Sequence, residues 1–270
     1  MRGPLGPPGV ESRAVTSPAS RAPLVVEATE LRKTYGRGAR AVEAVRGIDL
    51  TLAAGQCLGL LGPNGSGKST TIKMTLGTLR PSGGRIETFG GPAGRRAARA
   101  RTGYVPEEAR RFGALTGRET VDLFARLQGM RGRAERRQRV DEALALVGLR
   151  TEAWRQRLST YSRDMARRLA VAAAWVHQPD LLVLDEPTSG LDPFGTEEIL
   201  ALLDTHRARG GATLLSTHDR LTAEKSCDEA VVLVRGRVGA AGSMSALLAS
   251  DDAPSLLPLM RAAGDGRDDG

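Results

Sequence analysis

The 270-residue sequence has little cysteine, no long apolar run and almost no lysine. Its two cysteines, Cys57 and Cys227, are too few for the disulfide framework that stabilises many small secreted domains. The longest apolar run, residues 169–176, has eight residues, whereas a membrane-spanning helix needs about 20. The N-terminus also lacks the apolar segment of a signal peptide. We therefore expect a protein without a transmembrane helix, cytoplasmic or at most peripheral to a membrane.

Lysine supplies only four of the 39 basic residues, and 31 acidic residues leave a formal charge of +8. Such a charge is typical of proteins that bind nucleic acid or an anionic membrane. However, residues 92–170 hold 19 arginines and 9 acidic residues, a net of +10, whereas the remainder has 20 basic and 22 acidic residues, a net of −2. Because the basic excess is confined to one block, we expect no specific nucleic-acid partner.

Composition divides the chain into three parts. Residues 1–23 are rich in proline, glycine and serine and lack apolar periodicity, which predicts a disordered leader. Residues 249–270 carry scattered aspartates and glycines and are predicted to form a flexible acidic tail. The structured body is expected to cover residues 24–248.

Apolar patterns within the body predict an α/β fold. Strands are expected at residues 24–29, 47–52, 57–61, 181–184, 212–216 and 230–234. Several of these runs are continuously apolar, which favours a parallel sheet covered on both faces. Between about 115 and 178 the apolar period becomes helical. We therefore expect a helical block, about 92–178, inserted between strands of the core.

A glycine-rich segment predicts a phosphate-binding loop. It fits the pattern G-x-x-x-x-G-K-[ST], follows an apolar strand and precedes a helix predicted over 71–79. Its backbone N–H groups and the positive helix N-terminus would surround phosphates. We expect Lys68 to reach the β- and γ-phosphates of ATP and Ser69 to bind Mg²⁺. The predicted nucleotide-binding residues are Gly62, Pro63, Asn64, Gly65, Ser66, Gly67, Lys68, Ser69 and Thr70.

Two carboxylates follow the apolar segment 181–184. Asp185 is expected to hold Mg²⁺, directly or through water. Glu186 is expected to be the general base that polarises the attacking water. Together with Lys68, these residues predict a nucleotide-hydrolysing site.

With these motifs, residues 24–248 resemble the ATP-binding subunits of ATP-binding-cassette (ABC) transporters. The segment 185–192, Asp-Glu-Pro-Thr-Ser-Gly-Leu-Asp, is similar to the family's second carboxylate motif and D-loop, the latter formed by Ser189, Gly190, Leu191 and Asp192. The resemblance implies a P-loop NTPase cassette: a RecA-like core with a parallel sheet, an N-terminal antiparallel β subdomain and an inserted α-helical subdomain. It also implies that Tyr35 stacks on adenine and that His218 is the switch histidine near the γ-phosphate.

The chain departs from the family pattern in two places. The Q-loop usually carries glutamine, and this chain has Glu107, whose carboxylate can still reach Mg²⁺ or water. The signature motif, usually Leu-Ser-Gly-Gly-Gln, is replaced by Tyr-Ser-Arg-Asp-Met, in which Ser162, Arg163, Asp164 and Met165 are expected to approach an ATP held by a second subunit.

Asp164 replaces the second glycine of that motif. A carboxylate there would repel the γ-phosphate by about 4 kcal/mol at ~4 Å and an effective dielectric of 20. Neutralisation by Arg163 or Arg167 is one alternative, and a slightly shifted loop that tolerates the carboxylate is another. Repulsion would predict a weakly active site and favour a heterodimer.

The resemblance implies an ATPase subunit, of the exporter type for drugs, lipids or polysaccharides, that powers a separate membrane permease. A second ABC ATPase subunit, identical or different, would complete the site, and the protein would lie peripherally on the cytoplasmic side of the cell membrane. The basic block would face acidic coupling helices or anionic inner-leaflet lipid, or form only a solvated surface. The alternatives are a soluble ABC ATPase without a transport role and a weakly hydrolysing regulatory subunit.

Overall fold

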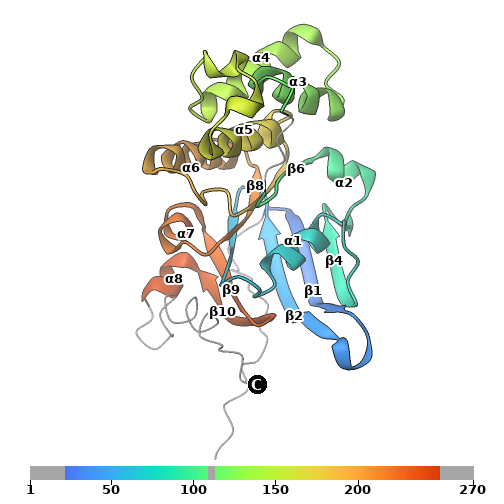
Figure 1. Cartoon of the computed structure of the whole chain (residues 1–270). Coiled ribbons are helices and arrows are strands. Elements are labelled where there is room, and N and C mark those ends of the chain that lie inside the picture. Colours follow the sequence, from blue (N-terminus) through green and yellow to red (C-terminus); the bar gives the residue numbers. More distant parts are fainter. Residues whose placement is uncertain (1–21, 109–112, 250–270) are drawn as a thin grey trace, which may run out of the picture.

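The computed structural model describes residues 22–108 and 113–249. The predicted leader and tail lie almost entirely outside these residues. Two β-sheets and the helices around them make up the described chain (Figure 1). None of the helices in the described part of the chain has the length and apolar content needed to cross a bilayer.

The first sheet is antiparallel, with strand order β2-β1-β4-β5. Its strands are β1 (Leu24–Tyr35), β2 (Val42–Ala53), β4 (Gly83–Thr88) and β5 (Gly91–Pro92). The second sheet has the order β10-β9-β3-β8-β7-β6, and all its pairings are parallel except that of β10 with β9. Its strands are β3 (Cys57–Leu61), β6 (Thr102–Val105), β7 (Leu181–Asp185), β8 (Ala212–Thr217), β9 (Glu229–Val234) and β10 (Arg237–Ser243).

The second sheet is buried on both faces, which explains its continuously apolar strands. Leu182 and Leu184 of β7 point into one core, which also contains residues of the helices, whereas Leu181 and Val183 point into another. This other core is shared with the antiparallel sheet through residues such as Ile48. Successive side chains of a strand alternate between faces, so a strand between two cores must be apolar throughout.

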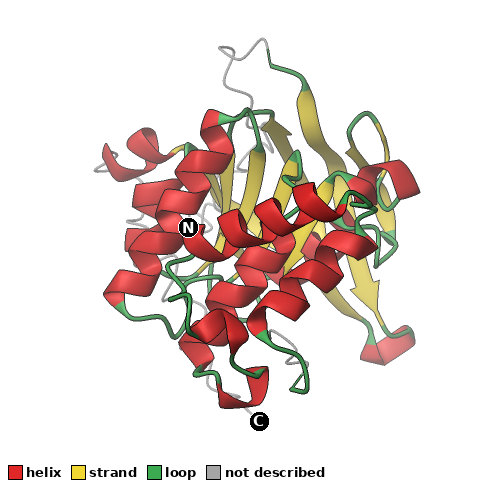
Figure 2. Cartoon of the chain, turned by 90° about the horizontal axis from the view of Figure 1, so that it is seen from above, coloured by secondary structure: helices red, strands yellow, loops and turns green. Residues whose placement is uncertain are grey.

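Helices cover the sheets, and Figure 2 shows them from above with the strands behind. Helices α3 and α4 lie at one end of the molecule, at the top in Figure 1, with α5 beneath them. These three helices follow β6 and precede β7 in the chain. The helices are α1 (Lys68–Thr75), α2 (Arg96–Ala100), α3 (Gly117–Leu127), α4 (Arg133–Leu146), α5 (Arg163–Trp175), α6 (Pro193–Ala208), α7 (Arg220–Ser226) and α8 (Met244–Ala249).

Several element bounds differ from the expectations. The strands predicted at 24–29 and 47–52 each extend to 12 residues. The helix predicted over 71–79 is instead Lys68–Thr75, so the lysine and serine of the phosphate loop already belong to its first turn. Strands β4, β5, β6 and β10 were not predicted; β4 and β10 have polar and glycine-rich sequences that show no apolar alternation.

Candidate functional site

The topology brings the predicted functional segments to one edge of the second sheet. Strands β3, β8, β7 and β6 are adjacent and parallel, so their carboxyl ends meet at this edge. The phosphate loop follows β3, His218 follows β8, Glu186 follows β7 and Glu107 lies just beyond β6. Ligands of open α/β sheets bind at this edge, at the carboxyl ends of the strands.

The backbone of the phosphate loop is shaped to present N–H groups. Gly62, Gly65 and Gly67 all have positive φ angles, of 142°, 79° and 111°. A Cβ on Gly67 would lie 2.7 Å from the Ala44 carbonyl oxygen, so only glycine fits there. The first intrahelical hydrogen bond of α1 runs from the Thr71 N–H to the Gly67 carbonyl, and no side chain caps the helix. The preceding N–H groups of the first turn are therefore free for an anion.

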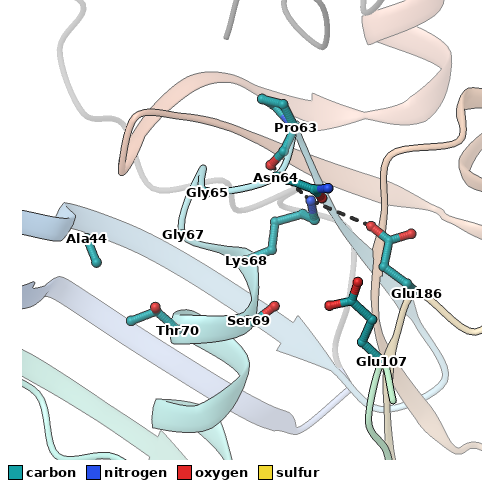
Figure 3. A pocket seen from close by; sticks show the side chains of 10 residues that line it. All are labelled: Ala44, Pro63, Asn64, Gly65, Gly67, Lys68, Ser69, Thr70, Glu107 and Glu186. Carbon is teal, nitrogen blue, oxygen red and sulfur yellow. Dashed lines mark hydrogen bonds and ion pairs between the residues drawn. The ribbon is translucent and has the colours of Figure 1, made fainter. Parts of the chain in front are cut away.

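Lys68 and Glu186 face each other across the site. The Lys68 ammonium donates hydrogen bonds to the carbonyls of Gly62 (2.6 Å) and Pro63 (3.1 Å). It also lies 3.6 Å from Oε1 of Glu186, and both side chains are about 6% exposed. Figure 3 shows the ammonium between Pro63 and the Glu186 carboxylate. This buried ion pair places the ammonium where it can meet a polyanion bound at the loop.

Ser69 and Asp185 form the oxygen-rich side of the site. The Ser69 hydroxyl lies 3.5 Å from Oδ1 of Asp185, which also accepts a hydrogen bond from the Ser216 hydroxyl. Asp185 is buried at the end of β7. Hydroxyl and carboxylate oxygens are the ligands that Mg²⁺ prefers. These two residues, with the Glu107 carboxylate, are a donor set that fits Mg²⁺.

Glu186 is held by backbone and side-chain contacts on β8. Its N–H donates to the Ser216 hydroxyl at 3.1 Å, and its φ of 50° is a left-handed conformation that non-glycine residues rarely adopt. Nδ1 of His218 lies 2.9 Å from Oε2 of the carboxylate. Such strain is found at active sites, where the surrounding structure fixes the residue. The arrangement aims one carboxylate oxygen at Lys68 and the other at His218.

A cavity of about 440 Å³ lies between these groups. Its lining residues are Ala44, Pro63, Asn64, Gly65, Gly67, Lys68, Ser69, Thr70, Glu107 and Glu186 (Figure 3). The structure thus brings most of the predicted phosphate loop together with Glu107 and Glu186. Gly62 and Ser66 are part of the loop but do not line the cavity. Asp185 and His218 do not line it either, but each contacts a residue that does, Ser69 and Glu186 respectively.

Tyr35 lies beside the cavity rather than in its lining. Its side chain is exposed, its hydroxyl is 3.5 Å from the Thr70 hydroxyl, and the Lys33 ammonium lies 5.4 Å from its ring centre. An exposed aromatic face at this place remains open to a planar base. The role of Tyr35 in stacking on adenine stays a prediction.

The segment predicted as the signature lies outside this cavity, at the start of α5. Ser162 is the N-cap residue of α5 and accepts a hydrogen bond from the Met165 N–H at 3.1 Å. Arg163 is exposed. This placement makes the segment available to another molecule rather than to the chain's own cavity.

Asp164 is paired within the chain. Both Nε (3.0 Å) and Nη2 of Arg168 donate to its Oδ2, and the two side chains are 21% and 12% exposed. Its Oδ1 lies against Gly195, where an added Cβ would come within 2.7 Å of it. The neutralising residue is therefore Arg168, one helical turn on, and not Arg163 or Arg167 as considered from the sequence. The repulsion of about 4 kcal/mol assumed an isolated charge, which this carboxylate is not.

The D-loop residues connect Glu186 with α6. Asp192 is the N-cap of α6 and its carboxylate accepts the Gly195 N–H at 2.6 Å. Ser189 and Gly190 are exposed and Leu191 is half-buried. Their predicted role at a partner's site stays a prediction.

Three residues contribute to the site in ways that the sequence did not predict: Ser216, Ala44 and Arg167. Ala44 of β2 lines the cavity, but nothing in the sequence distinguishes this alanine as a binding-site residue. Arg167 of α5 donates hydrogen bonds to the carbonyls of Pro106 (2.9 Å) and Glu107. Sixty residues separate Arg167 from Glu107 in the sequence, and no local pattern predicts such a contact.

Comparison with known proteins agrees with this geometry. Residues 45–189 match the ABC transporter family. The chain is 38% identical over 234 residues to an uncharacterized ABC transporter ATP-binding protein of Nostoc sp., covering 85% of this chain and 70% of that protein. It is 41% identical over 228 residues to Nod factor export ATP-binding protein I of Paraburkholderia xenovorans, covering 84% and 73%. The solved structure of cbiO1 from Clostridium perfringens, part of the ABC transporter complex cbiONQ, has a TM-score of 0.73 and 31% identity, covering 84% of this chain and 91% of that one.

The chain therefore belongs to the family of ABC transporter ATP-binding proteins. It is an ABC ATPase, and the fold class predicted from its sequence is confirmed.

Proposed function

We propose that this chain binds Mg·ATP and hydrolyses it to power export by a separate membrane permease. The observation that carries the proposal is the meeting of Lys68, Ser69, Asp185, Glu186 and His218 at adjacent strand ends. Relatives whose names state an export or resistance role, such as Nod factor export ATP-binding protein I and linearmycin resistance ATP-binding protein LnrL of Bacillus subtilis, support the exporter role. The permease would select the cargo, and the chain would lie peripherally on the cytoplasmic side of the membrane.

Each residue has a separate task in this proposal. The first-turn amides of α1 and Lys68 bind the phosphates, and Tyr35 stacks on the base. Ser69, Asp185 and Glu107 hold Mg²⁺, which supplies charge neutralisation at the phosphates. Glu186 accepts the proton of the attacking water, and His218 orients the Glu186 carboxylate through their 2.9 Å contact.

A second ABC ATPase subunit would complete the site. The start of α5 and the D-loop are accessible yet do not line the chain's own cavity, which supports contact with a partner's ATP. Because Asp164 pairs with Arg168, its charge does not favour an asymmetric heterodimer over two identical subunits. Arg163, exposed at the helix N-terminus, would then be the residue that faces the partner's nucleotide.

The basic excess supports contact with anionic lipid at the membrane surface. Arg95, Arg96 and Arg99 near α2 and Arg131, Arg133 and Arg137 near α4 are exposed. None of them forms an ion pair with another of the described residues. Each such cation near an anionic surface contributes about 1 kcal/mol. Liposome binding should therefore require anionic lipid and weaken with salt, and equal binding to neutral liposomes would contradict this contact.

Equilibrium nucleotide binding tests the site itself. Titration with ATP and Mg²⁺ should give saturable binding, and Lys68→Ala should weaken it by more than tenfold because a buried cation would be lost. Lys73→Ala is the matched control, since Lys73 lies on the same helix and is exposed. Equal losses in both variants, or no binding by the wild type, would overturn the proposal.

A further inference from the structure

Arg167 holds the backbone of the loop that carries Glu107. Arg167 lies on α5, one turn after Arg163, and does not line the cavity. Nη1 donates to the Pro106 carbonyl at 2.9 Å and Nη2 donates to the Glu107 carbonyl. The guanidinium fork thus fixes two successive peptide groups, which one ammonium cannot do with the same geometry.

The positions of these two peptide groups set the backbone conformation at Glu107 and therefore the direction of its side chain. Glu107 follows the short strand β6 and lines the cavity, with its carboxylate turned toward Lys68 and Ser69 (Figure 3). The Glu107 side chain itself makes no hydrogen bond or ion pair with another of the described residues. Its backbone contacts with Arg167 are therefore the only polar contacts, among the described residues, that orient it.

Arg167 also interacts electrostatically with the carboxylates of the site. Burial lowers the pKa of its guanidinium, and the carboxylates of Glu107, Asp185 and Glu186 oppose that shift. Among the described residues, Lys68 is the only cation that lines the cavity. Arg167 is thus a second cation close to the same three carboxylates.

We propose that Arg167 is a positioning residue that holds the Glu107 carboxylate at the Mg²⁺ side of the nucleotide cavity. The inference rests on the proposed function, in which Glu107 is a ligand of Mg²⁺. The guanidinium fixes the peptide groups on either side of Glu107. Its positive charge offsets the carboxylate that this chain carries at a position where ABC ATPases usually have glutamine. Arg168, the next residue, cannot substitute because it is bound to Asp164 and to the Gly148 carbonyl.

Binding of ADP, measured by calorimetry in EDTA and in Mg²⁺, tests the proposal without relying on turnover. The ratio of the two affinities reports how much Mg²⁺ strengthens nucleotide binding. Arg167→Met should reduce this ratio by about tenfold, the low end of the effect of removing residues that orient metal ligands. The affinity in EDTA should stay unchanged. Arg167→Lys should recover part of the ratio because charge returns without the fork.

A double-mutant cycle separates positioning from general destabilisation. Glu107→Ala should reduce the ratio as Arg167→Met does, and the double variant should be no worse than Glu107→Ala alone. Arg150→Met, an exposed position shortly after α4, is the control and should match the wild type. Thermal unfolding of every variant confirms that each is folded at the temperature of the titration.

The results that would overturn the inference are distinct from those that would overturn the proposed function. A wild-type ratio in Arg167→Met, equal losses in EDTA and Mg²⁺, or losses that add to those of Glu107→Ala would refute the role of Arg167. A wild-type chain that binds no nucleotide in either solution would refute the proposed function, and this inference with it.

Discussion

The substitution Asp164→Gly restores the glycine that ABC ATPases usually have in the signature motif, and we expect it to destabilise the chain. It removes the carboxylate that pairs with Arg168, whose side chain is only 12% exposed. Removing one partner of a buried pair costs about 3–5 kcal/mol, and less for the partly exposed pair here. The lost interaction of an acidic residue with the first turn of α5 adds about 0.3–1 kcal/mol. The expected loss is about 3 kcal/mol, which lowers Tm by roughly 6–12 °C in a chain of this size.

Thermal and denaturant unfolding measure this loss, and ATP turnover is measured in the same preparations below the lowered Tm. We expect no gain in turnover, because Asp164 is already neutralised. Asp164→Gly/Arg168→Met should recover part of the stability, since no unpaired charge is left. An unchanged Tm together with a large rise in turnover would refute the pairing and restore the repulsion hypothesis.

Three further outcomes follow from the structure. Gly67→Ala should abolish nucleotide binding, because its Cβ would lie 2.7 Å from the Ala44 carbonyl; Gly210→Ala, with a φ of +82° but nothing within 4 Å, should bind normally in the same titration. His218→Ala should lower turnover by about 100-fold with little change in ATP affinity, and a parallel loss of affinity would contradict its role at Glu186. Burial lowers the pKa of His177 to about 4 from 6.5, so the unfolded state takes up the proton first as pH falls. Stability should therefore fall between about pH 6.5 and 4, by at most about 3 kcal/mol, and His177→Gln should flatten that part of the pH–stability curve.

The parts of the fold that the sequence predicts well are those with local signals. Strand β3 has the predicted bounds, Cys57–Leu61, because a continuously apolar run ends there in the glycines of the phosphate loop. Strand β7 extends one residue beyond its prediction, to Asp185, for a similar reason: its apolar run ends at a carboxylate. Strand β4 is formed by Gly83–Thr88, which contains one isoleucine and is held mainly by its backbone pairing with β1. No apolar period could indicate it.

The same distinction applies to the site. The phosphate loop is a continuous motif, so its residues are placed together as soon as the strand and helix around it form. The Asp164–Arg168 pair has the spacing of neighbours on a helix face, and a helix predicted from residue 163 would have suggested it. The contact of Arg167 with Glu107 depends on how α5 packs beside β6, and only the tertiary structure contains that information.

We infer that Glu186 activates the attacking water in a site that binds Mg·ATP. Single-turnover hydrolysis and ATP binding, measured together for the wild type and Glu186→Gln, test it most directly. Glutamine keeps the size of the side chain and its backbone contacts on β8 but cannot accept the proton. We expect binding to be retained and hydrolysis to fall by at least about 100-fold. Hydrolysis at the wild-type rate in Glu186→Gln would contradict the account.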